Sequence, residues 1–230
     1  MLTHRRSKAL DQADLGWLKA KHHFRVSPAG NPALTPLGSL FVWNDDEIAA
    51  NSGFPLHGHR DTEIITYVRE GVLSHRDTLG GEAQINAGDI QVMSAGSGIR
   101  HAEFNAGREP VKVYQIWLKP REAGLEPRWQ TKPVARSSTG RFAILASGFA
   151  DEDQALPIRV DARLLGAKLA PGERILHAIE TPFAYLVVAS GRIAIDGEPM
   201  GAHDGVAITH ASHIEISASE PSELVMVETG

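Results

Sequence analysis

Short runs of β-branched and aromatic residues, separated by turns rich in glycine, proline, asparagine and aspartate, make up most of this chain. Such side chains pack well on a pleated surface, so runs of this length predict β-strands. The second half contains no long amphipathic helical pattern. The pattern therefore predicts an all-β fold with few short helices. The expected strands are residues 37–44, 64–68, 90–93, 113–118, 141–146, 158–169, 175–179, 184–188, 192–195, 206–208, 214–216 and 224–227.

The segment before residue 37 has a different pattern. Residues 11–24 carry apolar side chains at loosely helical spacing, so a short helical turn and then an edge strand are expected at one end of a barrel. His22 and His23 would point to opposite faces of an extended chain, so at most one of them could approach an interior site. Neither is expected to bind a metal ion.

The two halves of the chain resemble each other. A shift of 120 residues aligns Gly71 with Gly191 and His57 with His177, which indicates a diverged tandem repeat of one β-unit. Between the halves, residues 122–135 are rich in proline and glycine and are expected to be an interdomain linker. We therefore predict an N-terminal domain at residues 1–130 and a C-terminal domain at residues 131–230.

Composition narrows the possible functions. The chain has 230 residues, 42% of them hydrophobic and 22% charged, and a formal net charge of -5, which gives no electrostatic reason to expect a nucleic acid or an anionic membrane as partner. It has no cysteine, so any metal ion must be held by histidines and carboxylates. Residues 1–17 carry charges throughout and lack the apolar core of a signal peptide, so a cytoplasmic location is expected.

Two short motifs in the first half carry metal-binding side chains two residues apart. They are His57-Gly58-His59 and His101-Ala102-Glu103. In a β-strand, positions i and i+2 lie on the same face, roughly 6–7 Å apart. Two adjacent strands would therefore aim three imidazoles and one carboxylate at one point, a donor set that suits a transition metal better than magnesium or calcium. The sequence predicts a mononuclear site with three histidines and one glutamate inside a β-barrel.

The second half is not expected to hold a second metal site. His59 aligns with Ile179, so one ligand is lost. His213 and Glu215 repeat the spacing of the second motif, but the neighbouring isoleucines form an apolar face opposite to them. Burial of those isoleucines would turn His213 and Glu215 toward solvent. The remaining histidines of this half, His177, His203 and His210, are expected on the surface or in loops.

The motifs resemble those of the cupin superfamily, and more narrowly those of the pirin family. The likeness is dense from about residue 16 to residue 127 and thin afterwards. Lys21-His22-His23-Phe24-Arg25-Val26 departs from the usual pirin phrase, which leaves substrate preference open. The phrases that carry the resemblance are Gly16-Trp17-Leu18, Gly38-Ser39-Leu40, Phe54-Pro55-Leu56-His57-Gly58-His59-Arg60-Asp61, residues 63–68, and residues 93–105 with Gly96, His101, Glu103 and Asn105.

The resemblance implies a bicupin, with two tandem antiparallel β-barrels of the double-stranded β-helix (jelly-roll) type packed face to face. It implies one metal ion in the N-terminal barrel, with His57, His59, His101 and Glu103 as ligands, and a degenerate C-terminal cupin without metal. Glu63 stands where many other cupins place their carboxylate ligand. In pirins the carboxylate after the last histidine takes that role, so Glu103 is preferred and Glu63 is expected to be structural.

The resemblance also implies an activity, that of short bacterial pirin-like quercetinases. The expected enzyme is a quercetin 2,3-dioxygenase, an oxidoreductase that opens a flavonol with O2 and releases CO. Iron(II) is the first expectation for the metal, with Mn, Ni, Co, Cu and Zn left open, and Glu103 doubles as ligand and catalytic base. Two alternatives are a cupin isomerase or hydrolase that uses the metal as a Lewis acid, and a non-enzymatic pirin that regulates partner proteins. The oligomeric state is left open, and a monomer is compatible with the sequence.

Overall fold

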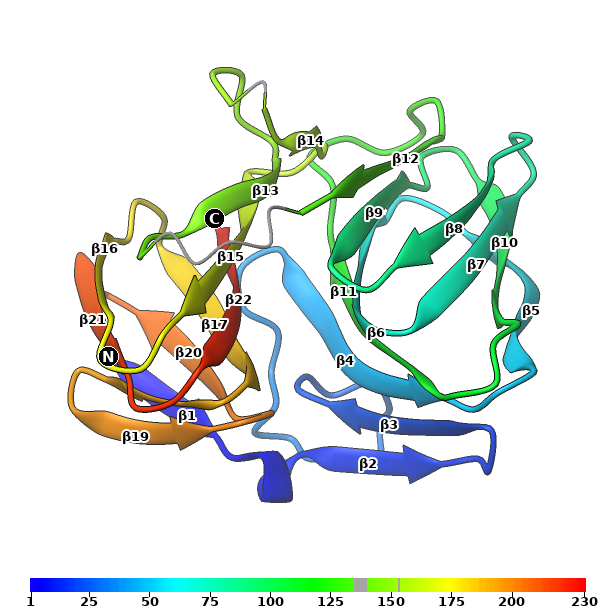
Figure 1. The fold of residues 1–230 in the computed structure, drawn as a ribbon. Coiled ribbons are helices and arrows are strands. Elements are labelled where there is room, and N and C mark those ends of the chain that lie inside the picture. Colours follow the sequence, from blue (N-terminus) through cyan, green and yellow to red (C-terminus); the bar gives the residue numbers. More distant parts are fainter. Residues whose placement is uncertain (135–139, 153) are drawn as a thin grey trace.

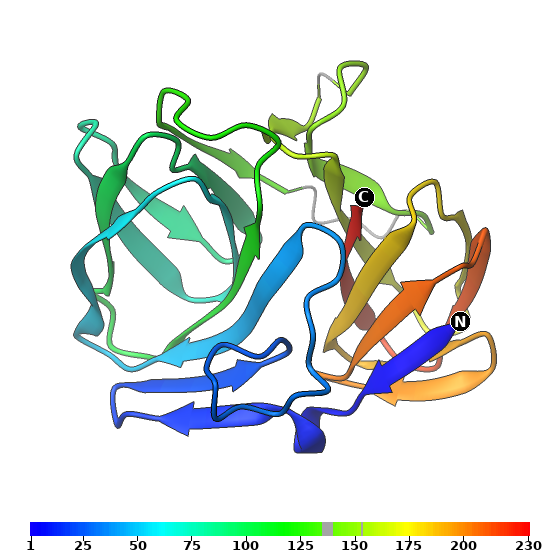
Figure 2. The same ribbon diagram turned by 180° about the vertical axis from the view of Figure 1, so that it is seen from behind.

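The computed structural model describes residues 1–134, 140–152 and 154–230, and nearly all its regular structure is β-strand. In these residues the only helix is a 3-10 turn at Ser7–Ala9. Figures 1 and 2 show two β-barrels side by side, and both chain termini lie at the barrel formed mainly by the C-terminal half. The all-β, two-barrel fold predicted from the sequence is confirmed. None of the described helical structure has the length and hydrophobicity of a membrane span.

The N-terminal barrel is built from two antiparallel sheets. The larger sheet has the strand order β12-β9-β6-β11-β4-β3-β2, and the smaller one has the order β5-β10-β7-β8. The strands are β2 (Asp11–Asp14), β3 (Leu18–His22), β4 (Leu40–Ile48), β5 (Ser52–His59), β6 (Glu63–Glu70), β7 (Val72–Asp77), β8 (Glu82–Asn86), β9 (Asp89–Ser94), β10 (Ile99–Asn105), β11 (Val111–Leu118) and β12 (Arg128–Pro133).

The C-terminal barrel has the same two-sheet plan. Its larger sheet runs β1-β20-β17-β22-β15-β13-β14 and its smaller sheet runs β16-β21-β18-β19. The strands are β1 (Leu2–Arg5), β13 (Ala143–Ser147), β14 (Leu156–Pro157), β15 (Ala162–Leu169), β16 (Arg174–Ala178), β17 (Phe183–Ser190), β18 (Arg192–Ile195), β19 (Glu198–Gly201), β20 (Gly205–Thr209), β21 (His213–Ala218) and β22 (Ser222–Thr229).

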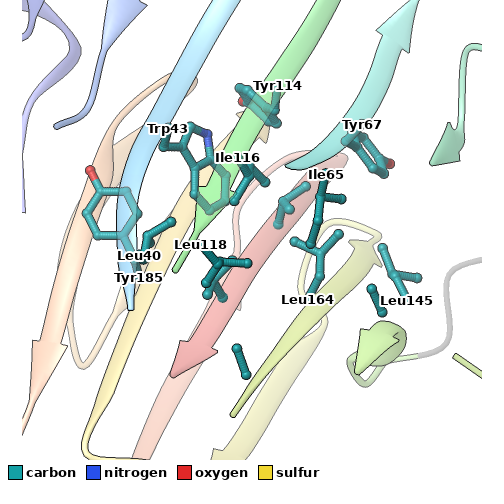
Figure 3. Packing of buried hydrophobic residues seen from close by; sticks show 14 of the residues in the cluster. Leu40, Trp43, Ile65, Tyr67, Tyr114, Ile116, Leu118, Leu145, Leu164 and Tyr185 are labelled. Carbon is teal, nitrogen blue, oxygen red and sulfur yellow. The ribbon is translucent and has the colours of Figure 1, made fainter. Parts of the chain in front are cut away.

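A single apolar cluster joins the two barrels. Trp43 and Tyr114 of the larger N-terminal sheet belong to the same buried cluster as Leu164 and Tyr185 of the larger C-terminal sheet (Figure 3). Because side chains alternate along a strand, the neighbours of these residues face the barrel interiors instead. The larger sheets thus pack on each other with one face and line a barrel with the other, as a face-to-face bicupin requires.

Three details differ from the sequence-based expectations. Residues 11–24 form strands β2 and β3, and the helical turn lies earlier, at Ser7–Ala9, because backbone pairing with β4 outweighs the weak helical spacing. β1 pairs with β20, so the start of the chain lies in the C-terminal sheet. The expected linker contains β12, which pairs with β9, and the predicted boundary after residue 130 falls inside that strand. Ala135, the last residue of the expected linker, lies outside the described residues.

Candidate metal centre

The three predicted histidine ligands meet inside the N-terminal barrel. β5 and β10 are neighbours in the smaller sheet, and His101 stands opposite His57 in their register. One ring nitrogen from each of His57, His59 and His101 lies within 4.8 Å of one from each of the others. The imidazole centroids are 4.5 Å apart for His57 and His101, and 4.8 Å apart for His57 and His59. The i, i+2 spacing and one strand pairing therefore suffice to cluster the three rings.

A bulge and a glycine bring β5 and β10 together at the fourth predicted ligand. The register shifts between His101 and Glu103, so that Glu103 stands opposite Phe54. A Cβ atom on Gly53 would lie 2.1 Å from the backbone oxygen of Glu103, which excludes any other residue at that position without a shift of the strand. Bulges commonly re-aim side chains next to functional sites. Here the extra residue lies in β5, between Phe54 and His57, and His101 and Glu103 remain on the same buried face of β10.

The protonation of the histidines fits a metal ion. The ring Nδ1 of His57 lies 2.8 Å from the carbonyl oxygen of Pro55, so Nδ1 must carry the proton and Nε2 keeps its lone pair. Both ring nitrogens of His101 are buried and have no hydrogen-bond partner among the described residues. Burial, with the nearby imidazoles, lowers the pKa of His101 to about 3 and that of His59 to about 4. Neutral imidazoles are the form that binds metal, and orphaned buried nitrogens need such a partner.

Glu103 is held by a row of polar residues on the opposite sheet. Gln115, Thr66 and Gln91 are register neighbours across β11, β6 and β9, and all three donate hydrogen bonds to the carboxylate. The Glu103 Oε1 atom accepts from Gln91 Nε2 at 2.5 Å and from Thr66 Oγ1 at 3.3 Å, whereas Oε2 accepts only from Gln115 Nε2, at 2.6 Å. Oε2 thus keeps a lone pair for a metal ion or a proton. Burial raises the pKa of Glu103 to about 7, against the effect of these hydrogen bonds.

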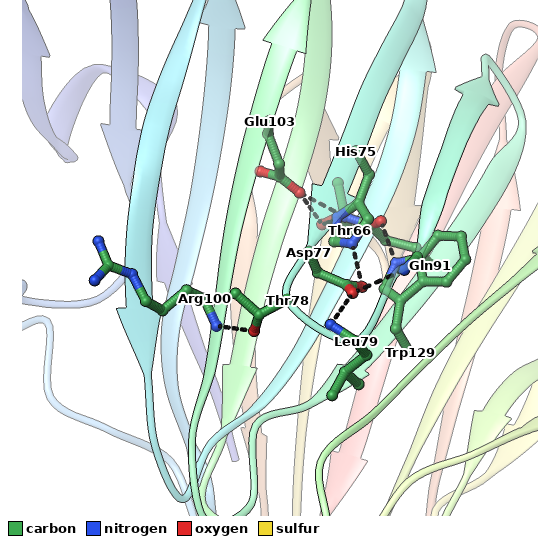
Figure 4. A network of polar contacts seen from close by, with 10 residues as sticks. Thr66, His75, Asp77, Thr78, Leu79, Gln91, Arg100, Glu103 and Trp129 are labelled. Atoms are coloured by element: carbon green, nitrogen blue, oxygen red, sulfur yellow. Dashed lines mark hydrogen bonds and ion pairs between the residues drawn. The ribbon is translucent and has the colours of Figure 1, made fainter.

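Sequence reasoning missed a fourth histidine beside this group, His75, which is buried. His75 on β7 stands opposite Glu103 in register, and its ligand atoms form a second compact group with those of His101 and Glu103. Glu103 thus groups with His101 and His75, and does not belong to the compact group of His57, His59 and His101. The His75 ring stacks on the Trp129 indole, with ring centroids 4.7 Å apart and planes 9° from parallel. The network is visible in Figure 4.

The tautomer of His75 follows from its partner. Asp77 Oδ1 accepts hydrogen bonds from the backbone N–H groups of Leu79 and Gly81, so Oδ2 is the oxygen left to accept from His75. The Asp77 Oδ2 atom lies 2.9 Å from His75 Nε2, so Nε2 donates. The Nδ1 atom then carries a lone pair, which is buried and has no partner within the described part of the chain. His75 Nδ1 is therefore a buried acceptor, in a ring whose centroid lies 5.5 Å from that of His101.

A cavity of about 260 Å³ opens onto the histidine cluster. All four predicted ligands line it, together with apolar and aromatic side chains. Its wall on the larger sheet includes Asp46, which the sequence analysis did not single out. Asp46 is 2% exposed, and burial, with the charges of Asp45 and Glu103, raises its pKa to about 8. The lining residues are Asn44, Asp46, Phe54, His57, His59, Ile64, His101, Glu103, Gln115 and Trp117.

Most of the other predicted residues lie where the sequence suggested. Glu63 does not line the cavity; its Oε2 accepts hydrogen bonds from Ser94 Oγ and from the Arg159 backbone N–H, at 2.7 and 3.2 Å. His213 and Glu215 are exposed while Ile214 between them is buried. His22 contacts Asn44 at the cavity wall, and His23 is buried against Tyr185 in the other barrel.

Two of the C-terminal histidines are less exposed than expected. His177 is half-buried and its Nε2 lies 2.8 Å from a carboxylate oxygen of Glu228. His203 reaches across to the N-terminal barrel, where its Nδ1 lies 2.5 Å from Asp45 Oδ2. Each is paired with a carboxylate rather than with other metal-binding groups. These contacts give both histidines structural partners.

Comparison with known proteins agrees with this geometry. The sequence profile of the Pirin family matches residues 3–118, over the barrel that holds the four candidate ligands. The chain belongs to the pirin family. A second profile, that of the quercetinase C-terminal cupin domain, matches residues 144–229 of this pirin. The two profiles together cover both barrels.

Relatives span its whole length. A pirin-like protein of Caulobacter vibrioides is 50% identical over 221 residues, 95% of each chain. A protein of Escherichia coli K12 named quercetin 2,3-dioxygenase is 34% identical over 230 residues, 99% of this chain and 98% of the relative. The crystal structure of the Escherichia coli pirin YhhW in complex with nickel(II) superposes with a TM-score of 0.93 at 34% identity, and covers 100% of this chain and 99% of that one.

Proposed function

We propose that this pirin is a metal-dependent dioxygenase of the quercetin 2,3-dioxygenase type, which opens the central ring of a flavonol with O2 and releases CO. The observation that carries the proposal is that three clustered imidazoles and the Glu103 carboxylate line one cavity, together with Phe54, Ile64 and Trp117. The name of the Escherichia coli relative supports the same reaction. An open cavity at a metal-binding cluster is typical of catalytic rather than structural sites.

The metal ion would be held by His57, His59, His101 and Glu103. The lone pairs of the His57 and His101 nitrogens and of Glu103 Oε2 fit a divalent transition metal. Iron(II) is our proposal for the working metal, although the related YhhW structure contains nickel(II). A bound cation of this kind would acidify a coordinated flavonol hydroxyl and bring it together with O2.

The side chains around the cavity would orient the substrate and accept its proton. Phe54, Ile64 and Trp117 line the cavity and provide the apolar contacts for a planar aromatic ring. Glu103 Oε2 has one free lone pair, which would bind the metal ion or, when released from it, take up a proton from the substrate. Gln91, Gln115 and Thr66 keep the carboxylate in place when its charge changes. Glu103 thus serves as ligand and as base.

The proposal is tested by separating binding from oxygen consumption. Iron-loaded protein is mixed with quercetin without oxygen, O2 is then admitted, and flavonol absorbance and CO are followed. We expect O2-dependent loss of absorbance with CO release in the wild type, and at least tenfold slower loss in His59→Ala and Glu103→Ala. Loss without O2 would favour an isomerase or hydrolase that uses the metal as a Lewis acid. The absence of any turnover in metal-loaded protein would favour the regulatory role.

A further inference from the structure

We propose that Asp46 determines substrate specificity by accepting a hydrogen bond from the flavonol 3-hydroxyl at its Oδ1 atom. This inference rests on the proposed function, because it assigns a residue to the substrate of that reaction. The hydrogen bond to Asp46 belongs to the substrate complex that precedes proton transfer to Glu103. Asp46 lies on β4, on the wall of the cavity formed by the larger sheet, whereas the histidine ligands lie on the smaller sheet. A substrate in the cavity would be held between the two walls.

Backbone geometry places Asp46 on that wall. Side chains alternate along β4, so Asp45 and Asp46 face opposite sides of the sheet. Asp45 pairs with Arg69 and His203 at the junction of the barrels, where its charge is neutralised. Asp46 faces the cavity together with Asn44, two positions before it on the same strand. The sequence pair Asp45-Asp46 therefore divides into one structural acid and one acid that faces the site.

The Asp46 carboxyl has an unused acceptor. Its Oδ1 atom is buried and has no hydrogen-bond partner in the described part of the chain. A buried polar atom without a partner is destabilising, and this one belongs to a residue that lines the cavity. The neighbouring carboxylate, Glu103, has three donors of its own, and none of the three reaches Asp46. A ligand that enters the cavity with a hydroxyl group would satisfy Oδ1.

A second unpartnered polar atom occurs in the lining of the same cavity. Trp117 lines it edge-on to the His59 ring, with centroids 5.0 Å apart, and its buried indole Nε1–H has no acceptor within the described residues. One orphan acceptor and one orphan donor suit a ligand that carries a hydroxyl beside a carbonyl. A flavonol presents that pair in its 3-hydroxyl and 4-keto groups. We assign the keto oxygen to Trp117 and the hydroxyl to Asp46.

Two ligands and two variants test the assignment. Flavone and 3-hydroxyflavone differ only by the 3-hydroxyl, and both carry the 4-keto group. Asp46→Leu removes the acceptor and keeps the branching of the side chain, and Trp117→Phe keeps an aromatic ring but removes the donor. Dissociation constants are measured for metal-loaded protein without O2, so that the result does not depend on turnover. Failure of the dioxygenase assay would then leave the binding data interpretable.

We expect the wild type to bind 3-hydroxyflavone more tightly than flavone by roughly tenfold. Asp46→Leu should reduce that preference, because only the metal ion would then recognise the 3-hydroxyl, and Asp46→Asn, which keeps an Oδ1 acceptor, should retain it in full. Trp117→Phe should weaken both ligands by a similar factor. Glu47→Leu, a change on the same strand that faces away from the cavity, should bind both ligands as the wild type does.

Three outcomes would overturn the inference. The first is a wild type that does not distinguish the two ligands. The second is an Asp46→Leu variant that keeps the wild-type preference. The third is loss of metal from Asp46→Leu, measured by elemental analysis after dialysis, because Asp46 would then act on the metal site rather than on the substrate.

Discussion

The indole Nε1–H of Trp129 donates a hydrogen bond to Gln91 Oε1 over 2.9 Å. This contact fixes the orientation of the Gln91 amide, because the oxygen is occupied and the nitrogen must face Glu103. The same indole stacks on His75. One side chain on β12, outside the ligand motifs, thus supports both Glu103 and the histidine beside His101 (Figure 4).

Trp129→Phe should therefore weaken metal binding without removing a ligand. The phenyl ring preserves stacking on His75, but the Gln91 amide is free to turn its oxygen toward Glu103. Loss of such supporting hydrogen bonds typically lowers metal affinity by roughly 10–100-fold. Competition with a chromogenic chelator measures the change. Trp43→Phe serves as the control, because Trp43 lies in the core between the barrels and its Nε1 has no partner among the described residues. An equal loss of metal affinity in Trp43→Phe would contradict the role of Trp129.

His101→Ala should abolish stoichiometric metal binding, whereas His213→Ala should leave it unchanged. His101 is shared by both compact groups of candidate metal-binding side chains, and His213 is exposed at the first position of β21. Metal content after loading and dialysis checks both variants. Equal loss from the two would show that the site is misplaced.

The clustering of three histidines in the N-terminal barrel could be predicted from the sequence, because it requires only strand periodicity and one strand pairing. His57 and His59 share a face at any register, and one antiparallel pairing adds His101. His75, Gln91 and Gln115 are brought to Glu103 by pairings between separate strands, which one sequence does not specify. For Gln91 and Gln115 the signal was a polar residue within an apolar run, as at Gln91 between Ile90 and Val92, whereas His75 stands between Ser74 and Arg76.

Asp46 and β1 were missed for related reasons. Asp45-Asp46 looks like an ordinary solvated acidic pair, and only the packing of the second barrel buries Asp45 and leaves Asp46 facing the cavity. β1 joins a sheet whose other strands lie more than a hundred residues later, so no local pattern could place it. Long-range pairings of this kind set domain boundaries that composition alone does not reveal.

The apo-protein should show opposite pH effects from the ligand histidines and from Glu103. The folded pKa of Glu103 is raised from 4.5 to about 7, so its contribution to stability is fully present below pH 4.5 and is lost as pH rises toward 7. The Glu103→Gln variant has no titrating carboxyl at this position, so it lacks this contribution to stability. Between pH 4.5 and 7, the free energy of unfolding of the wild type should therefore fall relative to the variant by up to about 1.4 kcal/mol per pH unit. Urea unfolding in the presence of a chelator measures the difference, and parallel curves would contradict it.

His59 and His101 act in the other direction. Their folded pKa values of about 4 and 3 lie below the ordinary value of 6.5, so their contribution is present above pH 6.5 and is lost as pH falls. His59→Ala should make the apo-protein less sensitive to acid between pH 6.5 and 4, whatever its stability at neutral pH. The same unfolding series checks this slope. An unchanged slope in His59→Ala would contradict this expectation.

The shared core predicts that the two barrels unfold together. Leu164 is fully buried in the C-terminal part of the cluster that also contains Trp43 and Tyr114 of the N-terminal sheet. Leu164→Ala should lower stability by about 2–5 kcal/mol, because it leaves a cavity between the sheets. Metal release reports loss of the metal-binding cavity, and circular dichroism reports loss of secondary structure. If the barrels are one cooperative unit, both transitions should shift to the same lower urea concentration. Separate transitions, with metal release unaffected by Leu164→Ala, would show that the N-terminal barrel is stable without its partner.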